Sequence, residues 1–111
     1  MSAAAQQIAS LRRLCGGPRD GALLRMSLAN ALLVAGDAAA AIAQLRQALQ
    51  FDPDYSAAWK LLGATLTQAG DAPAAVAAYR AGIGAAEKRG DKQAQKEMQV
   101  FLRRLEKSLD A

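Results

Sequence analysis

Apolar side chains recur along most of this chain at spacings of three and four residues, with polar positions between them. Such spacing puts one apolar stripe on a helix of 3.6 residues per turn. No run of β-branched residues alternates with a period of two, so the pattern predicts helices and no strands. About six helices are expected, over residues 3–15, 22–35, 38–51, 55–69, a fifth that ends near residue 89, and 92–109.

The expected breaks between helices fall at glycine, proline and aspartate. Glycine permits the left-handed residue that ends many helices, and an aspartate side chain can cap the next helix. The pairs Gly36-Asp37, Gly70-Asp71 and Gly90-Asp91 fit both roles. Gly16-Gly17-Pro18 ends the first helix, and Asp20 is predicted to cap the second. Two glycines inside the fifth segment, at positions 82 and 84, are unusual for a helix.

The turn Ala35-Gly36-Asp37-Ala38 returns 34 residues later as Ala69-Gly70-Asp71-Ala72. Other positions recur in step: Ile8, Leu11 and Arg12, then Ile42, Leu45 and Arg46, then Val76, Tyr79 and Arg80. A fixed period of this length is typical of a repeat architecture. It divides the chain into two full units, 22–55 and 56–89, with helix 3–15 in phase before them. Helix 92–109 follows out of phase by several residues.

The second unit, Ser56 to Arg89, resembles the tetratricopeptide repeat. The matching positions are Trp59, Leu62, Gly63, Gly70, Asp71, Ala75 and Tyr79, whereas Leu66, Gly82 and Glu87 replace the usual tyrosine, alanine and proline. In the first unit Arg25 stands in place of the tryptophan. The resemblance implies an all-α array of helix-turn-helix repeats, an α-α superhelix, as one domain over residues 1–111. Residues 3–15 are then a half-repeat, and 92–109 a capping helix.

The resemblance also implies a function, because partner peptides of this family lie in a concave groove lined by the first helix of each repeat. The groove positions here are Met26, Asn30, Leu33, Val34, Lys60, Ala64, Thr67 and Gln68. Amide and ammonium groups among them could hydrogen-bond a peptide, while Met26 is adaptable to apolar side chains. For Leu33 and Val34, packing beneath the helix is an equal alternative. The protein is therefore expected to be an adaptor that binds a peptide or protein segment.

Two alternative functions remain open, one based on the apolar stripe of the last helix and one on the net positive charge. The stripe Met98, Phe101, Leu102 and Leu105 could meet a second chain and make a homodimer or scaffold. The chain has 14 basic and 10 acidic residues, a net charge of +4, which mildly favours an acidic partner. Weak nucleic-acid binding through basic helix faces would need a contiguous patch, and the basic residues are spread along the chain.

Catalytic chemistry is not expected, because the chain lacks histidine and has a single cysteine, Cys15. Histidine is the commonest general base and metal ligand, so no catalytic residue, metal site or cofactor is predicted. No glycine-rich phosphate loop is present. The chain shows neither a secretory signal nor an apolar run long enough to span a membrane, and a cytoplasmic protein is expected.

Overall fold

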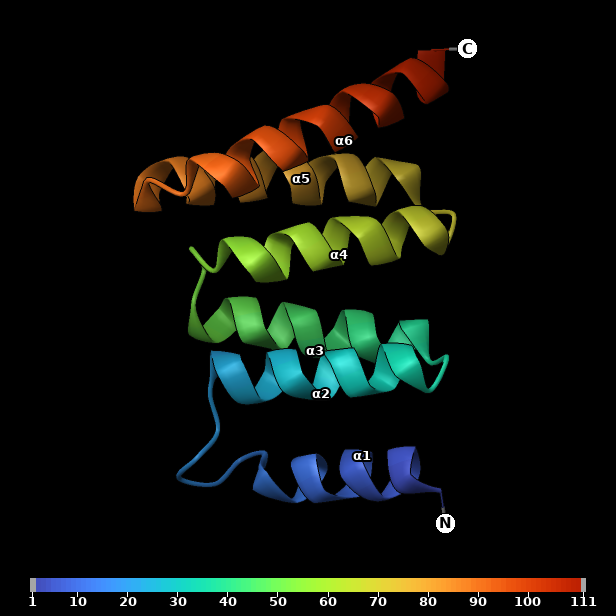
Figure 1. The fold of residues 1–111 in the computed structure, drawn as a ribbon, viewed down its shortest axis with the longest axis vertical. Coiled ribbons are helices and arrows are strands. Elements are labelled where there is room, and N and C mark those ends of the chain that lie inside the picture. The colour runs from blue at the N-terminus through green and yellow to red at the C-terminus, as the bar shows by residue number, and fades with distance from the viewer. Residues whose placement is uncertain (1, 111) are drawn as a thin grey trace. The chain divides into compact units, whose positions relative to one another are not determined.

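The computed structural model describes residues 2–110, which form helices and no strands (Figure 1). The all-α prediction is confirmed, and the helix ends differ from the expected ones by one residue at most places. The helices are α1 (Ala3–Leu14), α2 (Ala22–Val34), α3 (Ala38–Phe51), α4 (Ser56–Gln68), α5 (Ala72–Arg89) and α6 (Lys92–Asp110).

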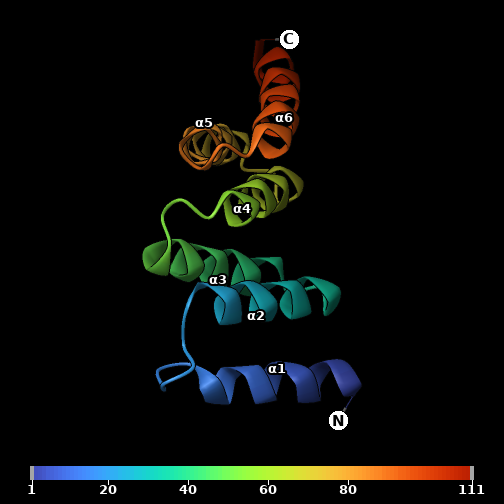
Figure 2. The same cartoon turned by 60° about the vertical axis from the view of Figure 1, so that its left-hand side comes forward.

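The helices fall into two compact units. The N-terminal unit ends at Asp52 and contains α1 to α3, and the C-terminal unit begins at Pro53 and contains α4 to α6. In the C-terminal unit α5 packs against both other helices, and α4 and α6 lie on the same side of it (Figure 2). Each unit therefore holds one full helical pair plus one flanking helix.

The Gly-Asp turns share one geometry, as the sequence predicts. Gly36, Gly70 and Gly90 have φ of +83°, +84° and +70°, the left-handed region that glycine enters without a steric cost. Each following aspartate accepts a hydrogen bond from the amide three residues later, at 3.1, 3.2 and 3.1 Å. The repeated dipeptide thus ends one helix and caps the next.

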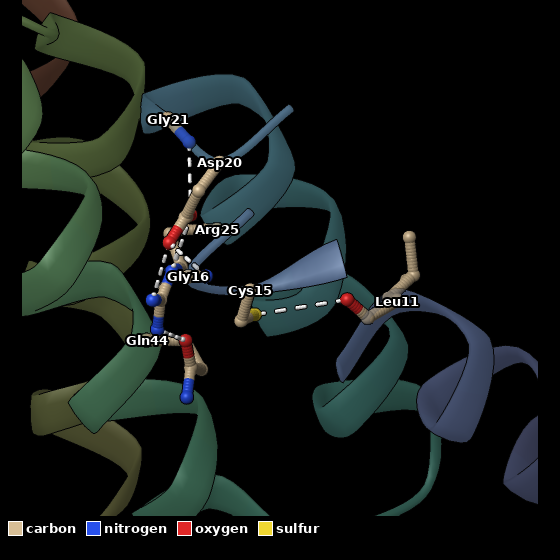
Figure 3. Close-up of polar contacts among 7 residues, drawn as sticks. All are labelled: Leu11, Cys15, Gly16, Asp20, Gly21, Arg25 and Gln44. Atoms are coloured by element: carbon tan, nitrogen blue, oxygen red, sulfur yellow. Dashed lines mark hydrogen bonds and ion pairs between the residues drawn. The ribbon is translucent and has the colours of Figure 1, made fainter. Parts of the chain in front are cut away.

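Asp20 does not have the predicted capping role. The residue that precedes α2 is Gly21, and no side chain caps this helix. Asp20 accepts hydrogen bonds from the amides of Gly16 and Gly21 instead, and its carboxylate pairs with the Arg25 guanidinium at 2.8 Å (Figure 3). Arg25 in turn donates to Gln44 of α3 at 2.9 Å. The arginine that replaces the usual tryptophan therefore joins the α1–α2 loop to α3.

The pair α2–α3 forms the core of the N-terminal unit. Leu28, Ala29, Ala41 and Leu45 are completely buried there. By contrast, α1 has no fully buried residue, and its stripe is only half covered. The single cysteine, Cys15, caps the end of α1, and its thiol approaches the Leu11 carbonyl at 3.6 Å.

Glycine allows close approach between the helices of the C-terminal unit. A Cβ added at Gly63 of α4 would lie 2.5 Å from the Tyr79 ring of α5. A Cβ at Gly82 would lie 2.5 Å from the Met98 sulfur of α6 and 2.6 Å from the Trp59 Cβ of α4. Gly82 is therefore the place where α5 meets both neighbours, which explains a glycine inside a continuous helix.

Candidate functional site

The predicted groove residues of α2 lie in the N-terminal unit and differ in exposure. Val34 is 84% exposed, so it does not pack beneath the helix, whereas Leu33 and Met26 are half-buried. Asn30 is exposed, and its amide nitrogen donates to the Met26 carbonyl of its own helix at 3.2 Å. Leu23 lies three residues before Met26 on the same side of α2, and it is 74% exposed. This helix thus presents an apolar face around one amide.

The predicted residues of α4 lie in the C-terminal unit. The Lys60 ammonium pairs with the Glu97 carboxylate of α6 at 3.4 Å, and both side chains are more than a third exposed. Thr67 donates to the Gly63 carbonyl at 2.7 Å, Ala64 is half-buried, and Gln68 is exposed. Lys60 therefore already has an anionic partner, which the sequence did not reveal.

Two hollows lie where α4 and α6 meet on this face. The first has a volume of about 200 Å³ and is lined by Ala57, Lys60, Asp91, Gln93, Ala94 and Glu97. The second, of about 360 Å³, is lined by Thr67, Tyr79, Phe101, Arg104, Leu105 and Ser108. We call the surface that carries both hollows the α4/α6 face. Its α6 residues were not among the groove residues predicted from the sequence, although Phe101 and Leu105 belong to the stripe that was expected as an alternative to meet a second chain.

Aromatic rings form one wall of the second hollow. The Tyr79 and Phe101 rings have centroids 5.7 Å apart and planes inclined by 39°. Burial raises the pKa of the Tyr79 phenol, and a hydrogen bond with Thr67 partly opposes that shift. The phenol therefore stays neutral at physiological pH. The hollow offers an apolar, uncharged wall with the Arg104 guanidinium at its edge.

Two ion pairs connect α6 to the rest of its unit. Glu97 pairs with Lys60 of α4, and Glu106 pairs with Arg80 of α5 at 2.9 Å. Beneath them, Met98 and Leu105 of the expected dimer stripe are buried, and α6 packs along α5 of the same chain. This part of the stripe is therefore covered without a second chain.

A spacing in the sequence could have identified α6 as a wall of this face. The buried Ala58 and Leu62 of α4 recur 36 positions later as the buried Ala94 and Met98 of α6. Two residues more than the 34-residue period thus separate equivalent positions. The longer α5 hides the equivalence when the period is held fixed.

Neither a metal centre nor a membrane span is indicated by the part of the chain that the structure describes. Residues 2–110 hold no group of three or more cysteine and acidic side chains placed to bind a metal ion. Among the same residues, no helix is both long and apolar enough to cross a bilayer.

Known proteins of similar sequence and structure contain the same helical repeat. A tetratricopeptide-repeat model matches residues 22–65. A TPR repeat-containing protein from Pseudomonas aeruginosa is 45% identical over 101 residues, which is 91% of this chain and 96% of that protein. A solution structure of a Bordetella parapertussis protein is 42% identical, covers 97% of this chain and 90% of its own, and gives a TM-score of 0.77.

A third similar structure is the TPR domain of Sgt2 from Aspergillus fumigatus. It is 26% identical, with a TM-score of 0.75, and the match covers 96% of this chain and 68% of that one. Repeats of this kind generally act as non-catalytic modules for protein–protein interaction. Together, the in-phase turns, the buried helical pairs and the relatives show that this chain belongs to the tetratricopeptide-repeat family.

Proposed function

We propose that this protein is a non-catalytic adaptor that binds a segment of a partner protein on the α4/α6 face of its C-terminal unit. The observation that carries the proposal is the presence of two hollows along that face, both lined by α4 and α6. A concave, partly apolar surface with a few polar groups is the usual form of a binding site. The predicted residues Lys60 and Thr67 belong to it, one in each hollow.

The first hollow suits a peptide backbone better than a lone carboxylate. Glu97 already neutralises Lys60, so a bound carboxylate would have to displace an ion pair at 3.4 Å. The pair itself offers an ammonium donor and a carboxylate acceptor side by side. Those are the two functions that a peptide C=O and N–H require.

The second hollow suits an apolar side chain. Tyr79, Phe101 and Leu105 supply apolar surface, and buried aromatic contacts contribute strongly to binding at protein interfaces. Thr67 and Ser108 add hydroxyl groups at the margin. In the N-terminal unit, Met26, Asn30, Leu33 and Val34 are proposed as a separate contact surface, since Val34 and Asn30 are exposed.

A pair of matched substitutions tests the site. Ala64→Arg places a large cation between the two α4 residues of the hollows, whereas Ala81→Arg places the same group on an exposed position of α5. Immobilised wild-type protein is expected to retain a partner from a lysate of the source cells. Ala64→Arg is expected to lose that partner and Ala81→Arg to keep it.

Circular dichroism verifies that both variants keep their helical content. Equal retention of the partner by both folded variants would contradict the α4/α6 face as the binding site. Equal loss by both variants would contradict it as well, because the α5 substitution lies off the face.

A further inference from the structure

We propose that the outward side of α6 is a second interaction surface, and that it binds an acidic protein segment carrying an apolar side chain. Lys92, Lys96, Arg103 and Lys107 follow one another at spacings of four, seven and four residues. With 3.6 residues per turn, these positions share an arc of about 60° and extend over about 22 Å. We call them, with Val100 and Arg104, the α6 ridge.

The ridge faces away from the core of its unit. Ala94, Met98 and Leu105 are the buried residues of α6, and they lie on the opposite side of the helix. All six ridge residues are exposed. This surface is also distinct from the hollows of the α4/α6 face, apart from Arg104, which borders one of them.

Within residues 2–110, the ridge cations form no ion pair with an acidic side chain. The ion pairs of Arg25, Lys60, Arg80 and Lys88 with carboxylates involve no ridge residue. Both glutamates in the middle of α6 turn instead toward α4 and α5. Arg103 donates to the Gln99 carbonyl of its own helix at 3.4 Å. The arrangement leaves uncompensated positive charge along one side.

The ridge also contains an apolar hollow, which indicates what kind of anionic partner it could bind. Val100, Arg103, Arg104 and Lys107 enclose a shallow hollow of about 400 Å³. Its walls are the valine and the aliphatic stems of the long cations. Single-stranded nucleic acids are commonly bound by stacking of their bases on aromatic side chains, and the ridge has none. A protein segment with carboxylates around one apolar side chain matches both the charge and the hollow.

In a second copy of this chain, most acidic side chains already have partners within that copy. Asp37, Asp71 and Asp91 accept amide bonds at helix starts. Asp20, Asp54, Glu97 and Glu106 are in ion pairs. We therefore assign the complementary carboxylates to a different protein.

A synthetic peptide tests the ridge with the full chain. A fluorescein-labelled helical peptide carries glutamates at the spacing of the ridge around one leucine, and a second peptide has glutamine in place of glutamate. Fluorescence anisotropy at about 20 and about 150 mM salt should show binding of the acidic peptide alone, weaker at the higher salt.

Two charge-reversing variants of equal net charge serve as test and control. Arg103→Glu/Lys107→Glu alters the ridge, and Arg12→Glu/Arg13→Glu alters exposed cations in the last turn of α1. The ridge variant should bind the acidic peptide about tenfold more weakly, and the control less than about twofold. Val100→Ala should weaken binding about threefold without changing its salt dependence.

Three results would overturn the proposal. They are the absence of peptide binding at low salt, equal weakening by the two double variants, and displacement of the peptide by an oligonucleotide or an anionic phospholipid vesicle at equal charge. Because Ala64→Arg leaves the ridge intact, it should keep full peptide binding. Failure of the ridge and failure of the α4/α6 face are thereby distinguishable.

Discussion

The two units contain the same helical repeat, but their flanking helices, α1 and α6, differ in burial and in polar contacts. In the N-terminal unit α1 buries no residue completely, and a polar cluster around Asp20 and Arg25 joins its following loop to α2 and α3. In the C-terminal unit α6 buries Met98 completely and adds two ion pairs to α4 and α5. One repeat pattern thus permits either a flanking helix without a fully buried residue or one that forms a wall of the candidate α4/α6 face.

The central pairs also differ at one equivalent crossing. Ala29 of α2 corresponds by period to Gly63 of α4, and Leu45 of α3 corresponds to Tyr79 of α5. Gly63 has no room for a Cβ because the Tyr79 ring occupies that space. A larger residue on one helix is therefore matched by a smaller one on the other, as close packing requires.

The largest expected change in the free energy of unfolding comes from substitutions in the flanking helices. Met98→Ala should lower the free energy of unfolding by about 2–5 kcal/mol, because it leaves a cavity at a fully buried position. Ile8→Ala on α1 should cost only about 1 kcal/mol, since that side chain is half-buried. Urea unfolding of both variants measures the difference. Equal costs would show that α1 is held as firmly as α6.

The next largest change in stability is expected for Gly63 and Tyr79, where α4 and α5 cross. Gly63→Ala should cost about 1–3 kcal/mol through overpacking against Tyr79. Adding Tyr79→Leu should recover part of that loss, since the double variant reproduces the Ala29/Leu45 pair of the other unit. A double-mutant cycle from thermal unfolding gives the coupling. Purely additive effects would contradict the proposed contact.

A smaller, stabilising effect is expected at Gly84. A Cβ there meets nothing within 4 Å, and the residue is helical and exposed. Gly84→Ala should raise the free energy of unfolding by about 0.5–1 kcal/mol, from helix propensity and reduced freedom of the unfolded chain. The melting temperature of Gly70→Ala should fall instead, because residue 70 has φ of +84°. The same sign for both would refute this assignment of the glycines.

The smallest expected change in stability concerns the carboxylate of Asp20. The hydrogen bonds from Arg25, then that from Gly16, hold the pKa of its carboxyl well below the ordinary value. A depressed folded-state pKa means that the stabilisation is complete above the unfolded pKa of about 3.9 and is lost as pH falls below it. Asp20→Asn should therefore reduce the melting temperature most at pH 7, and the reduction should shrink progressively as the pH falls below about 3.9 towards the folded-state pKa. A pH-independent difference would show that charge is not the cause.

Local chemistry made the turns predictable, and the same reasoning failed at Asp20. The Gly-Asp pairs act through one residue's φ and one hydrogen bond over three positions, so their roles can be read from neighbours in the chain. Asp20 was expected to act in the same way. Arg25, five residues later, binds its carboxylate instead, and Gln44 of α3 holds that arginine. The outcome depended on a contact with another helix.

The sequence alone determined the helices, their turns and the repeat, because helical periodicity, glycine torsions and aspartate caps involve residues within a few positions of each other. Tertiary structure decided which carboxylate pairs with Lys60 and why Gly82 lies inside a helix. These features join residues on different helices. They arise only when close packing brings those side chains together, so no local pattern encodes them.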